Sequence, residues 1–338
     1  MLQIRKAAFL GCISQSLRRQ CHNLSQSEDK TLIISPCILN SIQSTLNSMY
    51  HSKISISVST ALLEASTYGH NEVIEVLISN GGVVNMGNYD SVTPLHFACL
   101  SGKASTVNLL IEKGAKVNAW NVDGSTPLCD ACCSGSRECV RILLANGADV
   151  NPRLCLTSPL HEAMLRDQWE CAKLLTDAGA KLDVMDCHFG TPLHIAAWKQ
   201  HMKSGFVILK AGANVNSLKM CETPLHYSAK AKDTSFISML IDFGADVYAT
   251  DNRGLLASGH VPDNHPIQML LQHFQANPRR LTDWCRLNIR KAIGTKRLSQ
   301  IKTLNFPTYL KNYLEYWEYS HLLSSKPTSL DMSGQCVT

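Results

Sequence analysis

Three groups of residues in this 338-residue chain have types and spacings that resemble those of metal-binding or catalytic sites. Cys129 and Cys132 form a Cys-x-x-Cys pair, and two thiolates at this spacing are typical ligands of zinc. His161 and Glu162 begin like the His-Glu-x-x-His helix of a metalloprotease, but Leu165 stands where the second His belongs. Histidines also recur in a row that could form a metal ladder or a catalytic row: His96, His161, His194 and His226.

These histidines belong to a longer repeat. A Thr-Pro-Leu-His motif, or a close variant, begins at five positions that are 32 or 33 residues apart: Thr93, Thr126, Ser158, Thr191 and Thr223. A glycine follows the same period, at Gly81, Gly114, Gly147, Gly179, Gly212 and Gly244. Two markers that share one period predict a tandem structural repeat.

Each repeat is predicted to contain a helix, a turn and a second helix. Thr or Ser before Pro is typical of a helix N-cap, because the hydroxyl accepts a backbone N–H and Pro gives up a donor that has no partner there. An apolar pair such as Leu143 and Leu144 ends the second helix, and the glycine after it can adopt the left-handed conformation of a C-terminal cap. One such unit is too thin to bury its own apolar face, so the units must stack.

Residues 57–276 accommodate six repeats and a truncated capping unit. The first copy begins at Thr60 and lacks the Pro and the His. The last copy decays at Gly254–Ala257, and we expect Pro266 to Phe274 to form a shortened closing helix. The predicted fold class is all-α, a solenoid of helix-turn-helix units with hairpin loops, followed by a small helical module.

The register of the repeats changes the interpretation of the chemical candidates. Cys129 occupies the histidine position of its repeat, and Cys132 occupies the small position that faces a neighbouring helix. We therefore interpret these cysteines as packing residues and expect neither a metal nor another cofactor. The sequence also contains no phosphate loop, dinucleotide glycine motif or nucleophile elbow, so we do not expect an enzyme.

After Pro278 the period ends and the composition becomes basic, with nine Lys or Arg and a single acid between residues 278 and 312. Leu281, Cys285 and Ile289 follow at steps of four, which places them along one face of a helix. A tail of about 35 residues buries little surface by itself. Its apolar face must therefore fold back on the last repeat or dock on another protein.

These two parts, in this order, resemble the ankyrin-repeat and SOCS-box family. The motif Thr-Pro-Leu-His-x-Ala at a 33-residue period is the ankyrin signature. In the tail, Leu281, Cys285 and Ile289 fit the family's elongin-binding helix, although Arg280 stands where a small residue or Pro usually precedes the Leu. Within the family, the chain looks like the branch with six repeats, and most like its thirteenth member.

A second element of the tail resembles the family's cullin-selecting Leu-Pro-hydrophobic-Pro sequence. It comprises Leu304, Asn305, Phe306 and Pro307, so Asn305 replaces the first Pro. The loss of a Pro that sets the backbone in advance puts the strength of cullin binding and the choice of cullin in question.

The resemblance implies a division of the chain into four segments. Residues 1–56 would be a leader that is partly disordered or helical, and residues 57–276 the ankyrin repeats. Residues 278–316 would be the SOCS box, and residues 317–338 a disordered C-terminal extension.

The implied function is that of a non-catalytic adaptor, which recognises the substrate for a ubiquitin ligase. The resemblance assigns elongin C, in its complex with elongin B, to Leu281, Cys285 and Ile289. It assigns cullin-5, with its RING protein, to Leu304, Phe306 and Pro307. Catalysis would then come from proximity, supplied by other subunits. The alternative is a plain ankyrin scaffold without a ubiquitin role, whose tail only closes the solenoid.

The sequence does not identify the protein substrate. Aromatic and apolar residues at hairpin tips and on the concave surface are candidates by position alone: Trp120, Trp169, Phe189, Trp198 and Met220. In this family the repeated His supports hydrogen bonding between neighbouring loops, which is the role we expect for the histidine row. Nucleic acid is not an expected partner, because the basic residues of the tail interleave with its apolar stripe and no base-stacking module is present.

The composition of the chain gives an expectation for the cellular compartment of the protein. The chain is 45% apolar and 17% charged, and it has no run of eighteen apolar residues, so we expect no membrane span. Its fourteen cysteines are irregularly spaced, which favours buried thiols and a reducing compartment, either the cytoplasm or the nucleus. Arg5, Lys6, Arg18 and Arg19, with no acid before Glu28, leave a mitochondrial presequence as the alternative. Import would separate the protein from the cytosolic machinery that its tail implies.

Overall fold

The computed structural model of the chain describes residues 55–152, 157–263, 265–277 and 279–323. The predicted leader therefore lies outside the described residues, apart from its last two positions. The chain divides into two units, and the second unit, Ser55–Thr338, contains every described residue.

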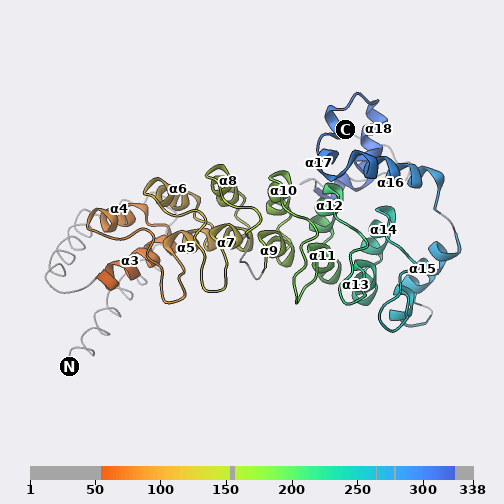
Figure 1. The fold of residues 1–338 in the computed structure, drawn as a ribbon, viewed down its shortest axis with the longest axis horizontal. Coiled ribbons are helices and arrows are strands. Elements are labelled where there is room, and N and C mark those ends of the chain that lie inside the picture. Colours follow the sequence, from red (N-terminus) through yellow and green to blue (C-terminus); the bar gives the residue numbers. More distant parts are fainter. Residues whose placement is uncertain (1–54, 153–156, 264, 278, 324–338) are drawn as a thin grey trace, which may run out of the picture. The chain divides into compact units, whose positions relative to one another are not determined.

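Pairs of short helices follow one another along residues 55–276 (Figure 1). The first helices of successive pairs pack against one another in one row, and the second helices pack in a second row. Hairpin loops connect the pairs, and three of these loops contain isolated β-bridges among the described residues, at Asp186–Gly190, Lys219–Glu222 and Thr250–Leu256. The all-α fold class is confirmed for the described residues. The complete pairs are α3 (Ser55–Tyr68) with α4 (Asn71–Ser79), α5 (Pro94–Leu100) with α6 (Ala104–Glu112), α7 (Pro127–Ser134) with α8 (Arg137–Ala145), α9 (Pro159–Leu165) with α10 (Trp169–Asp177), α11 (Pro192–Lys199) with α12 (Met202–Ala211), and α13 (Pro224–Ala231) with α14 (Thr234–Asp242).

The repeat markers have the roles that their chemistry predicts. Thr93 is the N-cap of α5, and its hydroxyl accepts the backbone N–H of His96 while the His96 side chain accepts the backbone N–H of Thr93. The same reciprocal cap begins α11 and α13. After the second helices the repeat glycines adopt positive φ, from 79° at Gly147 to 100° at Gly212 and Gly244.

Small residues let the helices of neighbouring repeats approach closely. Ala98, Ala131 and Ala196 are fully buried in the first helices, and Leu110 and Leu143 are fully buried in the second helices. The core is therefore a continuous layer between the two rows of helices, and each unit depends on its neighbours for burial.

The capping unit is truncated at a different place from the one we predicted. Its second helix, α15 (Pro266–Ala276), has 11 residues. It is longer than the second helices of the other pairs, which we call the outer helices: α4, α6, α8, α10, α12 and α14. The first helix is the shortened element, reduced to the 3-10 turn η1 (Ala257–His260). The Thr-Pro helix start is replaced here by Leu256 and Ala257, so the chain lacks the hydroxyl cap and the fixed N1 residue that begin the first helices of the five preceding pairs.

The tail forms a small group of helices after α15. Their core contains Leu298, Ile301 and Leu314, with Ile289, Ile293 and Leu310 packed against it. We predicted a disordered extension over residues 317–338, and this prediction is wrong for its first seven residues. Residues 317–323 form a 3-10 helix, and its Tyr319 packs against Phe206 and Phe243. The remaining residues, 324–338, lie outside the described part of the chain. The elements are α16 (Leu281–Ile293), α17 (Thr295–Leu298), η2 (Ile301–Thr303), α18 (Thr308–Leu314) and η3 (Trp317–Leu323).

Replacing Gly205 with alanine tests the packing of the second row. Gly205 lies inside α12, where an added Cβ would fall 2.6 Å from Cζ of the fully buried Phe236 on α14. We expect Gly205→Ala to lower the free energy of unfolding by about 1–3 kcal/mol through overpacking, even though alanine is the better helix former by about 1 kcal/mol. Urea unfolding measures the change. Lys203→Ala, at an exposed position of the same helix, should change stability by less than about 0.5 kcal/mol. An alanine variant as stable as the wild type would contradict the close approach of α12 and α14.

Candidate docking surface

Helix α16 has favourable signals at both ends. Asp283 lies in its first turn, and Arg290 and Lys291 lie in its last turn, so the side-chain charges complement the helix dipole. Gly294 ends the helix with φ 77° and ψ 151°, a conformation open to glycine and strained for other residues. These signals favour a helix with the observed bounds, Leu281–Ile293, and the bounds determine which side chains lie on each of its faces.

One face of α16 points away from the rest of the structure. Leu281 is 80% exposed and Trp284 is 53% exposed, and Cys285 beside them is exposed as well. One and two turns further on, Asn288 and Ala292 continue the same stripe and are also exposed. The structure thus brings the predicted Leu281 and Cys285 together on a free apolar surface. Trp284 was missed, although its place three residues after Leu281 puts it on this face.

Ile289 lies to one side of this stripe. Its side chain is half-buried and packs against the tail core of Leu298, Ile301 and Leu314. The predicted step of four from Cys285 turns far enough around the helix to reach this core, because four residues exceed one turn of 3.6. Ile289 therefore contributes to the folding of the tail, while Leu281, Trp284 and Cys285 remain available.

The opposite face of α16 is covered by the rest of the chain. Arg286 and Arg290 are both buried on this side. The guanidinium of Arg286 lies 3.9 Å from the ring centre of Tyr313 and 4.4 Å from that of Tyr316, and it donates to Glu318 at 2.5 Å. Sequence reasoning gave these arginines no structural role, and their spacing of four residues on the side opposite Leu281 was the available signal.

The predicted cullin-contacting stretch lies between η2 and α18. Leu304 is half-buried with an extended backbone, whereas Phe306 and Pro307 are exposed. Pro307 is the N-cap residue of α18, and Tyr309, in the first turn of that helix, is 75% exposed. The Tyr313 hydroxyl on α18 donates to the carbonyl of Thr282 at 2.5 Å, so this stretch belongs to a helix that packs beside the start of α16. Two apolar surfaces are therefore presented by one small module.

The histidine row connects neighbouring hairpin loops. Nδ1 of His96 accepts the Thr93 amide at 3.1 Å, and Nε2 lies 3.2 Å from the Ser125 carbonyl oxygen of the next loop. Accepting at one ring nitrogen and donating at the other is the arrangement of a neutral imidazole. Burial lowers the pKa of His96 to about 4, and it does the same for His194. The next-loop contact recurs at His161 with Gly190, at His194 with Glu222 and at His226 with Leu255.

Cys129 takes over the role of the missing histidine in its repeat. Its sulfur accepts from the Thr126 hydroxyl at 3.5 Å and reaches the Thr157 carbonyl oxygen of the next loop at 3.9 Å. Cys132 is fully buried on the same helix, and burial raises the pKa of its thiol well above the ordinary value. Cys129 therefore takes part in the hydrogen bonds between loops, and Cys132 packs in the interior.

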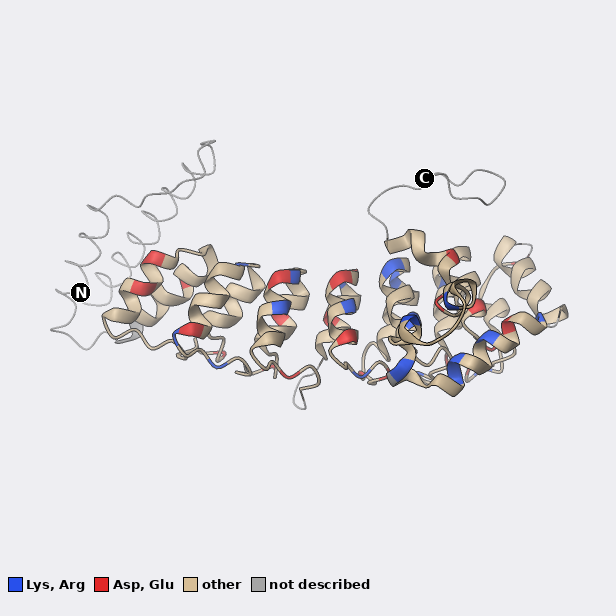
Figure 2. Cartoon of the chain, turned by 90° about the horizontal axis from the view of Figure 1, so that it is seen from above, with Lys and Arg blue, Asp and Glu red and all other residues tan. Residues whose placement is uncertain are grey.

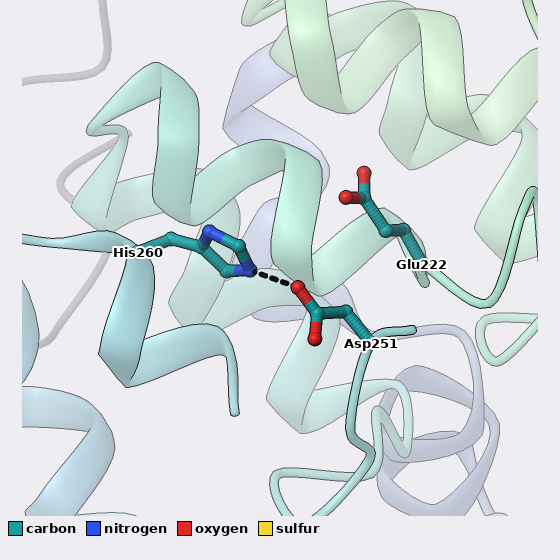
Figure 3. A group of neighbouring side chains, drawn as sticks. All are labelled: Glu222, Asp251 and His260. Atoms are coloured by element: carbon teal, nitrogen blue, oxygen red, sulfur yellow. Dashed lines mark ion pairs between the residues drawn. The ribbon is translucent and has the colours of Figure 1, made fainter. Parts of the chain in front are cut away.

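Glu222, Asp251 and His260 gather beside the capping unit, with potential ligand atoms within 4.8 Å of one another (Figure 3). Asp251 accepts the amides of Arg253 and Leu255 with one carboxylate oxygen, and its other oxygen lies 3.0 Å from Nε2 of His260. Glu222 accepts from Lys230 at 2.5 Å. The contact of Asp251 with His260 joins the hairpin before η1 to η1 itself, whereas Glu222 pairs with Lys230 of α13.

Charges of both signs are scattered over the helices of the repeats (Figure 2). Some form exposed pairs, such as Arg137 with Glu170 at 3.4 Å and Arg141 with Glu138 at 3.6 Å. The basic tail is less available than its composition suggests, because Arg286 and Arg290 are buried against other parts of the protein. Among the described residues, no helix combines the length and the apolar character that crossing a membrane requires.

The residues considered as target contacts differ in exposure. Met220 is 78% exposed at a hairpin tip where both Met220 and Cys221 have positive φ. Trp120 and Trp198 are also exposed, whereas Trp169 and Phe189 are half-buried. Exposed aromatic and methionine side chains are typical of protein interfaces, which keeps Trp120, Trp198 and Met220 as candidates.

Family models match both parts of the chain. A model described as ankyrin repeats in three copies matches residues 37–121 and 62–154, and a single ankyrin repeat matches residues 221–252. A SOCS box model matches residues 277–315, which includes all of α16 and α18.

Similar proteins combine the same two parts. Ankyrin repeat and SOCS box protein 5 of Mus musculus is 38% identical over 162 residues, 48% of this chain and 49% of that protein. Ankyrin repeat and SOCS box protein 13 of Homo sapiens is 48% identical over 135 residues, 40% of this chain and 49% of that protein. The chain thus spans about half the length of the relatives it matches. The solved ankyrin repeat domain of human ASB11 is 34% identical, with a TM-score of 0.61, over 64% of this chain and 99% of that domain.

Proposed function

Because the chain belongs to the ankyrin repeat and SOCS box family, we propose that it is a substrate-recognition adaptor of a cullin-RING ubiquitin ligase. The tail would attach the protein to the ligase, and the repeats would hold the protein to be modified. The chain itself would be non-catalytic, since the matched models are ankyrin repeats and a SOCS box and catalysis would come from the other subunits.

The observation that carries this proposal is the exposed apolar face of α16. Leu281, Trp284 and Cys285 remain uncovered even though the tail packs against the repeats through its other side. An apolar patch that the chain does not cover itself is typical of a protein interaction site. We propose that elongin C, in its complex with elongin B, covers it, and that Ile289 supports this face from below.

The alternative function, a plain scaffold, makes a different prediction for the same surface. In a scaffold the tail would only close the solenoid, and its outer face would need no partner. The exposure of Leu281 favours the adaptor, because closing the repeats uses the opposite face of α16.

Co-expression of the full chain with elongins B and C tests the proposal. An adaptor should elute with both elongins in equal amounts during size-exclusion chromatography and should be more soluble than the chain alone. A scaffold should elute alone and stay soluble without them.

We further propose that Leu304, Phe306 and Pro307 contact cullin-5, and Asn305 gives a test. Leu304 has φ −67° and ψ 148°, the extended conformation that a following proline requires. Asn305→Pro should therefore fit, and it should tighten cullin-5 binding by about 0.4–1 kcal/mol, because a proline reduces the freedom lost on binding. Calorimetry of the elongin-bound protein with cullin-5 measures the change. Asn312→Pro, inside α18, is the control that should weaken binding by breaking the helix. Unchanged or weaker binding of Asn305→Pro would argue against this contact.

We place the protein in the reducing cytoplasm, where these ligase subunits would meet it. Cys99, Cys132 and Cys171 are buried free thiols, which suits such a compartment.

The protein target would bind the exposed tips and the first-helix side of the repeats, where Trp120, Trp198 and Met220 are exposed.

A further inference from the structure

The tail is fastened to the ends of two particular outer helices, α12 and α14. Helix α17 and η3 both pack against α12, and Figure 1 shows the tail beside these helices. The last carbonyl groups of an α-helix have no partner within the helix, and the C-terminal end carries a partial negative charge. Such an end attracts hydrogen-bond donors and cations.

Arg290 donates hydrogen bonds to carbonyl groups at the C-terminal end of α12. Its Nη2 donates to the carbonyl of Lys210 at 2.8 Å and to that of Leu209 at 3.3 Å, and its Nη1 donates to the Leu314 carbonyl of the tail at 2.7 Å. One buried guanidinium therefore joins α12 of the repeats to α16 and α18 of the tail. The planar group with several fixed donors suits this task, and a lysine could not reproduce it.

Tyr316 satisfies the end of α14 in the same way. Its hydroxyl donates to the carbonyl of Asp242, the last residue of α14, at 3.1 Å. Its fully buried ring stacks on Phe243, with 3.7 Å between ring centres and 18° between planes. The guanidinium of Arg290 lies 5.1 Å from this ring, which links the two fastenings. Tyr319 adds a hydrogen bond to the Asp242 carboxylate at 2.5 Å.

The repeat glycines show that the fastening is confined to these two repeats. A Cβ at Gly212 would meet Leu298 and Thr295 of the tail, and a Cβ at Gly244 would meet Leu287 of α16. The equivalent positions Gly114, Gly147 and Gly179 have no such neighbour within 4 Å. The tail therefore occupies one place along the repeats, set by side chains that recognise the ends of α12 and α14.

We propose that Arg290 and Tyr316 are positioning residues, which fix the direction of the α16 docking face relative to the repeats. This inference rests on the proposed adaptor function. A ligase transfers ubiquitin by proximity, so a target held on the repeats must stand at a set distance from the subunits held by α16. Arg290 and Tyr316 set this geometry while touching neither the target nor the elongins.

Single-molecule energy transfer in the full-length chain tests the proposal. Dyes attached through noncanonical residues at Glu112 on α6 and Asn312 on α18, both exposed, report the distance between repeats and tail. The wild type should give one narrow distribution. Arg290→Met and Tyr316→Ala should each broaden it about twofold or more, because domains without a well-packed interface move relative to each other.

Two matched variants separate positioning from general damage. Lys291→Met removes the same charge from the neighbouring exposed position and should keep the narrow distribution. Tyr316→Phe keeps the stacked ring and loses only the hydroxyl, so it should restore most of the wild-type behaviour. Elongin B/C pull-down with Arg290→Met should stay within about threefold of wild type, because the outward face is unchanged.

Several results would overturn the inference. A broad distribution in the wild type, or a narrow one in both Arg290→Met and Tyr316→Ala, would show that these residues do not fix the tail. Loss of elongin binding in Arg290→Met with the distance distribution unchanged would assign Arg290 to docking. Failure of the wild type to bind elongins would refute the proposed function instead, while the distance measurement would still decide whether the tail is held.

Discussion

Aspartate at both Leu281 and Cys285 should abolish elongin B/C binding while leaving the protein folded. Both side chains are exposed on α16, so the charges remain in water in the free protein. In the complex the same charges would be buried against an apolar partner without a counter-charge. Substitution of a residue at the centre of an interface can weaken the binding free energy by about 2 kcal/mol or more. We therefore expect the double variant to lose at least a hundredfold in affinity, which corresponds to about 2.7 kcal/mol.

Calorimetry with purified elongin B/C measures this loss, and circular dichroism checks the fold. Met269→Asp, on α15, is the matched control, because Met269 is an apolar residue that is 58% exposed on a helix outside the tail. It should bind as the wild type does. If the double variant binds elongins as tightly as Met269→Asp does, the docking face lies elsewhere.

Acid should destabilise the repeats through the buried histidines. The pKa of His96 and of His194 is lowered by burial to about 4, whereas an unfolded histidine has a pKa of 6.5. Between these values the unfolded chain takes up protons that the folded chain refuses, so the free energy of unfolding decreases as the pH falls. From pH 7.5 to pH 5 each histidine should remove about 2 kcal/mol, and the two together about 4 kcal/mol. Burial lowers the pKa of His161 and His226 in the same direction.

Asp130 opposes this trend. Burial raises the pKa of its carboxyl to about 7, so the folded protein takes up a proton there before the unfolded chain does, and stability rises as the pH falls. Asp130→Asn removes this compensation and should expose the full decrease of about 4 kcal/mol between pH 7.5 and pH 5 in urea unfolding. Asp123→Asn, at an exposed hairpin tip, should keep the shallower profile of the wild type. A flat profile in Asp130→Asn would contradict the assignment of neutral, buried histidines.

The sequence predicts the repeats well because their signals are local and recur. The Thr-Pro pair, the histidine three residues after the cap and the glycine after the second helix each act within their own unit or on the next loop. The capping unit was predicted less well. Loss of the Thr-Pro start at Leu256 and Ala257 shortened the first helix, whereas Pro266 still provides a regular start for the second.

The exposed face of α16 could be predicted only in part, because its limits depend on contacts between distant residues. A step of four from Leu281 reaches Cys285, which is also exposed, but the next step reaches Ile289, which the tail core partly covers. Nothing near Arg290 in the sequence indicates its partners at Leu209 and Lys210, about eighty residues earlier. Likewise, the order at residues 317–323 follows from Tyr319 reaching Asp242 and not from a local helix signal. Long-range packing therefore determined what the sequence pattern left open.

Photo-crosslinking from position 281 tests the central claim most directly. A benzoylphenylalanine in place of Leu281, in the full chain expressed in cells, extends from an 80% exposed position on the proposed docking face. Irradiation followed by mass spectrometry should identify elongin C as the main crosslinked protein, and the same probe at Met269 should not capture it. Crosslinks from position 281 to the chain's own repeats, or to proteins other than elongin C, would contradict the account.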